Sequence, residues 1–239
     1  MVNKELLKKR FKKSLHTYDD NAISQKLTAQ KLVELLPKKN YRKVLEIGCG
    51  SGILTQIIYK NFQPKEYFLN DIVPDCEKFI DKILPQKEFI CGDIDKINIQ
   101  NKFDLIISNA ALQWSEDINA TVFKLINMLE NKGILAFSTF KEDNLFEIKE
   151  VLNIGLNYTK PNEQKNMHTI ELEPQVLWFD SPKDVLKHLK LTGVNALQEY
   201  VWSKSKLKNF EAEYKTLFEK NGKVSLTYKP LCTIFEKLD

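Results

Sequence analysis

The sequence predicts an α/β fold built on a doubly wound, mostly parallel sheet. Five short apolar segments follow one another over residues 43–140, in the order that such a fold requires. The first segment, Val44–Ile47, runs directly into three alternating glycines, and a helical stretch begins at Ile53. Later segments end in acidic or amide side chains, and ligands of open parallel sheets bind outside such carboxyl ends.

The glycine loop Gly48-Cys49-Gly50-Ser51-Gly52 is the strongest indication of a ligand site. Alternate glycines permit positive φ angles and remove the Cβ atoms that keep a ligand away from the backbone. The helix that follows offers unpaired N–H groups and the positive end of its dipole. The preceding Glu46 either orders this loop or accepts a hydrogen bond from an amine of the ligand, and Cys49 is expected to contact the ligand. The form E-x-G-x-G-x-G differs from the G-x-G-x-x-G fingerprint and disfavours a nicotinamide cofactor.

Two acids at strand ends extend this site. Tyr67–Asp71 is the second segment and ends about 20 residues after the glycines, where a carboxylate can accept from both hydroxyls of a ribose. Phe89–Ile94 ends the third, and its Asp93 can accept from an adenine amino group. Ile72 beside Asp71, like Ile94, belongs to the expected cofactor contacts. Each acid alone fits a helix N-cap or a turn equally well. Taken in order with the glycines, the set favours a cofactor that contains adenosine.

The rest of the chain completes the expected organisation. The fourth segment, Phe103–Asn109, leads into residues 110–114, Gly133–Ser138 is the fifth, and Asn109 joins the cofactor contacts. Beyond it we expect a strand at Gln175–Phe179, a helix capped at Ser181-Pro182 that runs to Gly193, a helix near 204–220, and a final strand at Leu231–Phe235 after Leu226-Thr227-Tyr228. We expect one domain over residues 1–239, with a helical arm (1–40, helical over about 4–36), a cofactor core (41–140), a substrate-selecting lid over the strand ends (141–222) and a C-terminal strand (223–239).

Composition excludes several classes of protein. With 239 residues and 43% apolar residues the chain can form a substantial core. No apolar run approaches the length of a membrane span, and the charged N-terminus does not resemble a secretory signal. The four cysteines lack C-x-x-C pairing and the three histidines are isolated, so we expect a cytoplasmic protein without a metal site.

A basic cluster stands out within a net charge of only +4. It lies on the expected N-terminal helix, whose apolar stripe includes Leu7 and Phe11, and comprises Lys4, Lys8, Lys9, Arg10, Lys12 and Lys13. The cluster is either a solvated helix face or a docking surface for an acidic macromolecule. Nucleic acid is disfavoured as a partner because the chain has only two arginines, and because Ser108-Asn109-Ala110-Ala111 stands where an N/D-P-P-Y/F base-flipping motif is expected.

Several motifs resemble known methyltransferases. The glycine loop is similar to motif I of the class I S-adenosylmethionine-dependent methyltransferases. More specific segments resemble the malonyl-acyl-carrier-protein O-methyltransferases of biotin synthesis over nearly the whole chain: Phe11, Tyr18 and Gln25 at seven-residue intervals, Ser108–Trp114 (S-N-A-A-L-Q-W), Leu177–Asp180 (L-W-F-D) leading to Leu189–Val194, and Leu226-Thr227-Tyr228. Lys12, Lys13 and Asn70 depart from the family pattern without removing a cofactor contact.

The resemblance implies a Rossmann-like, seven-stranded sheet and methyl transfer from S-adenosylmethionine to the free carboxylate of a malonyl thioester on acyl carrier protein. It implies that Tyr18 and Gln25 close over the cofactor and that Tyr18, Gln113 and Trp114 serve the reaction. If the basic residues form a docking surface, we expect the acidic carrier to bind there, through Lys8, Lys9, Arg10, Lys12 and Lys13. A monomer is the favoured oligomeric state. Core packing is an equal alternative for Tyr18 and Trp114, and Gln113 either holds the acceptor or caps a helix. The alternative substrate is a small soluble carboxylate, such as an aconitate-like acid.

Overall fold

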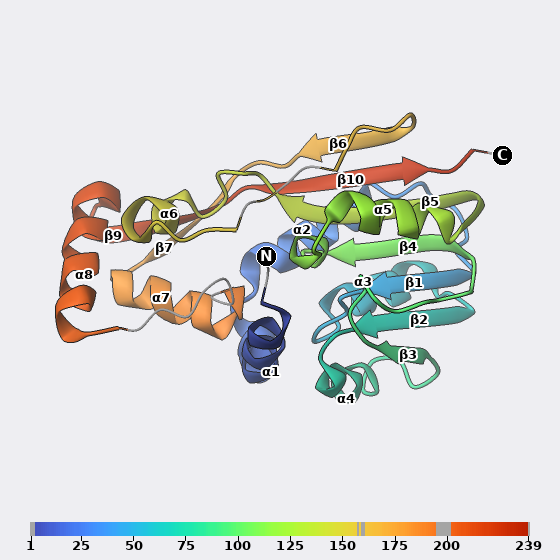
Figure 1. The fold of residues 1–239 in the computed structure, drawn as a ribbon, viewed down its shortest axis with the longest axis horizontal. Helices are drawn as coiled ribbons and strands as arrows, with labels where there is room; N and C mark the ends of the chain where they lie inside the picture. Colours follow the sequence, from blue (N-terminus) through green and yellow to red (C-terminus); the bar gives the residue numbers. More distant parts are fainter. Residues whose placement is uncertain (1–2, 157, 159–160, 195–201, 239) are drawn as a thin grey trace.

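The structure, a computed structural model, describes residues 3–156, 158, 161–194 and 202–238. Its larger sheet has seven strands in the order β3-β2-β1-β4-β5-β10-β6 (Figure 1). β1 to β5 run parallel to one another, whereas β10 is antiparallel to both β5 and β6. The bounds are β1 Lys43–Ile47, β2 Glu66–Asp71, β3 Glu88–Cys91, β4 Phe103–Asn109, β5 Leu129–Phe140, β6 Met167–Glu171 and β10 Pro230–Glu236. The predicted mostly parallel sheet of seven strands is confirmed.

Helices cover both faces of this sheet, which explains why its central strands are apolar on both sides. Val44 and Leu105 face α2 (Ile23–Glu34) and α3 (Ile53–Phe62) in one core cluster. The adjacent residues Leu45 and Ile106 face α5 (Ile118–Asn127) in the other. The short elements η1 (Pro74–Cys76) and α4 (Glu77–Ile80) connect β2 to β3, and η2 (Leu112–Trp114) follows β4.

A second assembly lies beyond the carboxyl ends of the parallel strands (Figure 1). It contains α6 (Phe146–Leu152), α7 (Pro182–Leu191), α8 (Lys204–Phe218) and a small antiparallel sheet of β7 (Gln175–Phe179), β9 (Lys223–Tyr228) and β8 (Glu219–Lys220). Buried aromatic residues that include Phe210, Tyr214 and Tyr228 join these elements into their own core. The predicted cap of α7 is confirmed, since the Ser181 side chain accepts from the Asp184 N–H. We use the name lid for these elements only.

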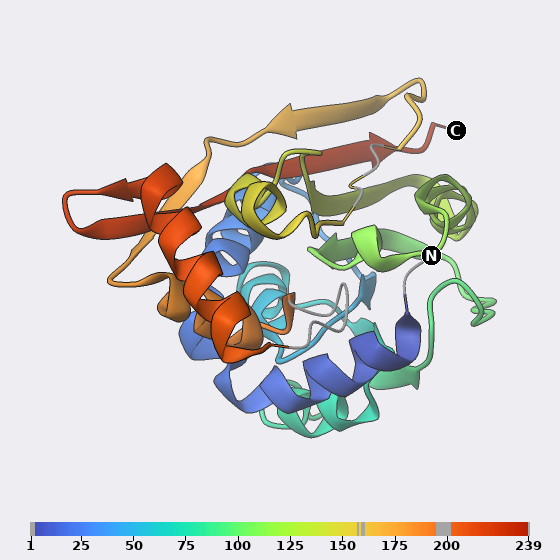
Figure 2. The same ribbon diagram turned by 60° about the vertical axis from the view of Figure 1, so that its left-hand side comes forward.

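The N-terminal arm is not one helix. α1 (Lys4–Asn21) ends at Ala22, whose ψ of 51° interrupts the helical backbone before α2. α2 packs on the sheet, whereas α1 lies between α7 and the segment after β2 (Figure 2). The Thr17 hydroxyl donates to the Leu191 carbonyl at 3.0 Å, and Lys12 pairs with Asp75 at 2.9 Å. The two halves of the predicted arm therefore have different positions and roles.

Three features of the strands differ from the sequence prediction. β6 was not expected, and it belongs to the large sheet although it falls within residues 141–222. β3 ends at Cys91, so Asp93 lies in the following loop rather than at the strand end. Residues 223–239 contain two strands, β9 and β10, which belong to different sheets rather than forming one C-terminal strand. In the parts of the chain that the structure describes, no helix is long and apolar enough to cross a membrane.

Candidate cofactor site and active site

The glycine loop turns where β1 ends and is held by the neighbouring strand. Gly48, Gly50 and Gly52 have φ angles of 70°, 53° and 92°. The N–H groups of Gly48 and Cys49 donate to the Asn70 carbonyl at 2.8 and 3.1 Å. A Cβ on Gly48 would lie 2.3 Å from the Ala111 Cβ, whereas a Cβ on Gly50 would meet nothing within 4 Å. The loop therefore packs closely against the segment after β4 and leaves open space beside Gly50.

That open space belongs to a cavity between the sheet and α1. Its sheet side is formed at the carboxyl ends of β1, β2 and β4 and by the loop after β3, and this includes the place where the strand order reverses between β1 and β4. The predicted residues that line it are Tyr18, Glu46, Gly48, Cys49, Gly50, Asp71, Ile72, Asp93, Ile94, Asn109 and Trp114. Residues predicted from five separate segments thus meet at one site.

Asp71 is an acid of the cavity that two backbone N–H groups hold in place. It is 8% exposed; its Oδ2 accepts from the Gly50 N–H at 2.9 Å and its Oδ1 from the Val73 N–H at 2.8 Å. Burial raises the pKa of this carboxyl, although the N–H groups of Val73 and Gly50 oppose the rise. Each carboxylate oxygen has two acceptor positions, so both oxygens can accept further hydrogen bonds from a ligand.

Glu46 lies deeper and has one oxygen without a partner. Its Oε2 accepts from the hydroxyls of Tyr67 at 2.7 Å and Thr55 at 2.9 Å. Its Oε1 is buried and has no hydrogen bond within the described residues. Burial raises the pKa of Glu46 to about 7, against the hydrogen bonds from Tyr67 and Thr55. Neither Tyr67 nor Thr55 belongs to the glycine loop, so these hydrogen bonds do not order that loop directly. The free Oε1 fits an N–H donor of a ligand.

The amide side chains near β4 divide into two groups. Asn109 lines the cavity; its Nδ2 donates to the Gln25 carbonyl at 3.1 Å and its Oδ1 accepts from the Ser138 hydroxyl at 2.7 Å. The side chains of Gln25 and Gln113 are not among those that line the cavity. Gln25 is buried, and Gln113 donates to the Ala110 carbonyl at 2.7 Å. Gln113 therefore holds the turn after β4, where Ala110 has a φ of 51°.

Aromatic side chains close the cavity on the side of α1. The Phe11 ring lies between Tyr18 and Trp114, with centroid distances of 6.4 and 5.9 Å. Trp114 is 8% exposed and also packs on Leu7, so it both packs and lines the site. Burial raises the pKa of the Tyr18 phenol, and the nearby carboxylates of Asp19 and Asp71 raise it further. Tyr18 therefore stays protonated at neutral pH.

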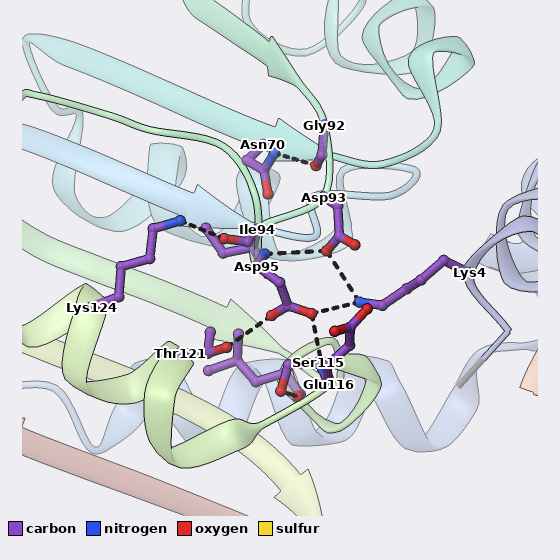
Figure 3. A network of polar contacts seen from close by, with 11 residues as sticks. Lys4, Asn70, Gly92, Asp93, Ile94, Asp95, Ser115, Glu116, Thr121 and Lys124 are labelled. Atoms are coloured by element: carbon purple, nitrogen blue, oxygen red, sulfur yellow. Dashed lines mark hydrogen bonds and ion pairs between the residues drawn. The ribbon is translucent and has the colours of Figure 1, made fainter. Parts of the chain in front are cut away.

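Lys4 is a residue of this cavity that was not predicted from the sequence. Lys4 lines it together with Leu7, Phe11, Leu15 and Tyr18, all from α1. Its Nζ lies 3.1 Å from Asp93 Oδ1 and 2.9 Å from Asp95 Oδ2 (Figure 3). The spacing of these five residues by three and four positions puts them on one helix face, and this pattern was the available signal. Lys4 thus does not belong with the outward-facing members of the basic cluster.

No group of His, Cys, Asp or Glu in the described part of the chain is arranged to hold a metal ion. The cavity does fit an adenosyl cofactor with a charged amine, because it combines the open side of Gly50, buried acceptors and the partnerless Oε1 of Glu46.

Comparisons with known proteins agree with this geometry. Residues 38–222 match the family described as a methyltransferase domain. The malonyl-[acyl-carrier protein] O-methyltransferase of Calditerrivibrio nitroreducens is 39% identical over 96% of this chain and 96% of its own length. The Haemophilus influenzae protein of the same name is 36% identical over 96% and 93%.

Among solved structures, the YcgJ protein of Bacillus subtilis has a TM-score of 0.61 at 13% identity and covers 89% of this chain and 98% of its own, so it supports the fold alone. The resemblance drawn from the arm, the segment after β4 and the lid is confirmed by the full-length relatives. The chain belongs to the malonyl-[acyl-carrier protein] O-methyltransferase family.

Proposed function

We propose that this chain transfers a methyl group from S-adenosylmethionine to the free carboxylate of a malonyl group on acyl carrier protein, an early step of biotin synthesis. One observation carries the proposal: the likeness to the Calditerrivibrio protein covers 96% of the chain, and therefore includes the arm and the lid as well as the cofactor core. A class I core alone leaves the acceptor open, since substrate choice depends on the segments around it.

The three cavity carboxylates would each accept hydrogen bonds from a different part of the cofactor. Asp71 would accept from the ribose hydroxyls, and Asp93 from the adenine amino group. Glu46 would use its free Oε1 for the ammonium of the methionine part, and this contact would favour the ionised carboxyl. Ile72 and Ile94 supply apolar surface beside the two aspartates. When bound, the cofactor supplies an electrophilic methyl group on a sulfonium.

Methyl transfer to this acceptor requires little acid–base catalysis. A malonyl carboxylate is already ionised at neutral pH, so no general base is needed. The aromatic wall of Phe11, Tyr18 and Trp114 limits access of water to the cavity. The transfer of methyl from a cation to an anion removes charge, and a dry site favours that step. Alignment of carboxylate and methyl group supplies much of the remaining acceleration.

Three residues are proposed for the acceptor side. Tyr18 offers a neutral phenol that can donate a hydrogen bond to the carboxylate without holding it as strongly as a cation would. Trp114 shapes the same wall as Phe11, with the two ring centroids 5.9 Å apart. Gln113 acts through the Ala110 carbonyl as a positioning residue, because its own side chain stays outside the cavity. Gln25 likewise supports Asn109 through its backbone carbonyl.

The carrier would dock on the outer face of α1. Lys9, Lys12 and Lys13 are exposed there, and Lys8 and Arg10 are half-buried. The pair of Lys12 with Asp75 is largely exposed, so an acidic partner can compete for it. Lysines suit broad attraction to an acidic protein, and this contribution should weaken with salt.

Mass analysis of acceptors after incubation with the chain and S-adenosylmethionine tests the proposal. Malonyl carrier protein, malonyl coenzyme A, free malonate and aconitate are compared at equal concentration. We expect malonyl carrier protein to gain one methyl group fastest. If a free small acid is methylated and malonyl carrier protein is not, the chain is a methyltransferase of small soluble carboxylates and the proposed acceptor is wrong.

A further inference from the structure

Lys4 forms a partly buried ion triad at one end of the cofactor cavity. The side chains of Lys4, Asp93 and Asp95 are 15%, 11% and 13% exposed. Figure 3 shows the Lys4 ammonium reaching between the two carboxylates. Such desolvated, hydrogen-bonded charges interact more strongly than surface pairs, and removing one partner leaves the others buried without compensation.

The triad joins α1 to a fixed point of the core. Asp95 Oδ2 also accepts from the Glu116 N–H at 2.9 Å, and its Oδ1 accepts from the Thr121 hydroxyl at 2.9 Å. Burial disfavours the charged form of Asp95, but the Glu116 N–H, the Lys4 ammonium and the Thr121 hydroxyl together lower the pKa of its carboxyl. Asp95 is therefore an ionised anchor, and the first turn of α1 is fastened to it.

Asp93 is shared between this anchor and the cavity. Its Oδ1 accepts from Lys4 and from the Asp95 N–H at 3.2 Å, whereas no hydrogen bond to its Oδ2 is found among the described residues. Asp93 lines the cavity, so the Oδ2 lone pairs are available to a donor inside it. The contacts on Oδ1 fix the orientation of this acceptor before any ligand arrives.

α1 forms the opposite wall of the cavity from Lys4 to Tyr18. A ligand that contacts Glu46, Asp71 and Asp93 together lies between the strand ends and this helix. The other end of α1 is also tied down, since the Ser51 hydroxyl donates to Asp19 Oδ1 at 2.5 Å. The helix is therefore fastened near both ends, and the Lys4 ion pairs are the contacts that fasten its first turn.

We propose that Lys4 is a cofactor-site residue that fastens α1 over the adenine end of the bound cofactor, with Asp93 shared between the Lys4 ammonium and the adenine amino group. This inference rests on the cofactor part of the proposed function and not on the identity of the acceptor. Closing α1 and binding adenine support each other, because both order the same carboxylate.

Release of S-adenosylhomocysteine, the product form of the cofactor, tests the inference without any acceptor. Stopped-flow fluorescence follows release, with Trp114 in the cavity wall as the reporter, in wild type, Lys4→Gln, Lys4→Arg and Lys12→Gln. Lys12→Gln is the matched control, because it removes an ion pair from the same helix at a site where Lys12 is 59% exposed. Thermal melts without ligand establish that each variant is folded.

We expect Lys4→Gln to release the ligand about tenfold faster, with less protection of residues 4–11 from hydrogen exchange in the bound state. Lys4→Arg should keep most of the wild-type residence time, and Lys12→Gln should stay within about twofold of wild type. A folded Lys4→Gln variant that releases ligand at the wild-type rate would overturn the inference. Wild type that fails to bind S-adenosylhomocysteine would overturn the cofactor assignment as well, whereas failure to methylate malonyl carrier protein would overturn only the acceptor.

Discussion

Glu46 should make the stability of the ligand-free protein fall as pH rises. This carboxyl is 1% exposed, and burial raises its pKa from the usual 4.5 to about 7. Because the protonated form is the one favoured in the folded protein, its stabilising effect is fully present below pH 4.5 and is lost as pH rises through about 7. This rise in pKa corresponds to a loss of about 3 kcal/mol in the free energy of unfolding. Most of the loss occurs between pH 5 and pH 8.

Glu46→Gln removes the ionisation and keeps an oxygen that can accept from Tyr67 and Thr55. The free energy of unfolding of wild type, measured relative to this variant by urea denaturation at pH 5, 6, 7 and 8, should therefore fall with rising pH. Glu66→Gln is the control: Glu66 pairs with Lys43, but its side chain is 58% exposed. Removing it should leave the pH dependence of wild type intact.

The same variant tests the role of Glu46 toward the cofactor. The loss of a charged acceptor for the methionine ammonium should weaken S-adenosylhomocysteine binding by about tenfold at pH 8, as measured by calorimetry. Parallel pH profiles of wild type and Glu46→Gln would refute the reasoning about burial. Equal ligand affinities would refute the proposed contact of Oε1 with the amine.

Three further predictions concern other parts of the molecule. Asp71→Ala should weaken S-adenosylhomocysteine binding by about tenfold or more, because the ribose acceptor and the partner of the Gly50 N–H are both lost; an unchanged Kd in calorimetry would contradict this role. Replacement of Lys8, Lys9, Lys12 and Lys13 with Gln should raise KM for malonyl carrier protein at low salt and leave kcat unchanged, whereas an unchanged KM would make these lysines a solvated helix face. His188 is buried and its pKa is lowered to about 4, so its stabilising effect is present above pH 6.5 and is lost as pH falls toward 4. Urea unfolding should show about 3 kcal/mol of acid sensitivity that His188→Gln lacks, and equal sensitivity in both proteins would count against it.

The elements that could be predicted from the sequence have a local signal, such as a continuous apolar run or a helix cap. β4 was expected at Phe103–Asn109 and has these bounds, since its apolar run is buried on both faces. α7 was located by the cap at Ser181 and by Pro182 in its first turn. β6 was missed because it is an edge strand with four exposed residues out of five, so it lacks the apolar alternation that identifies a half-buried strand.

Contacts between distant segments account for the remaining differences. β7 was expected as a strand, but its pairing with β9 in a separate sheet is a choice of partner that no local pattern specifies. The sequence placed Asp71 and Glu46 in one site because both belong to a known order of motifs. Lys4 was assigned to the basic cluster because its partners, Asp93 and Asp95, lie 89 and 91 residues away in the sequence. Gln25 and Gln113 were expected in the site from the resemblance, whereas each supports it from outside the cavity.

The acceptor is tested most directly by comparing two carrier substrates that differ in a single group. Malonyl carrier protein and acetyl carrier protein are each incubated with the chain and S-adenosylmethionine, and the intact mass of each carrier is followed. Only the malonyl form has a free carboxylate, so it should gain one methyl group while the acetyl form stays unchanged. Methylation of both carriers, or of neither while S-adenosylmethionine binds normally, would contradict the account.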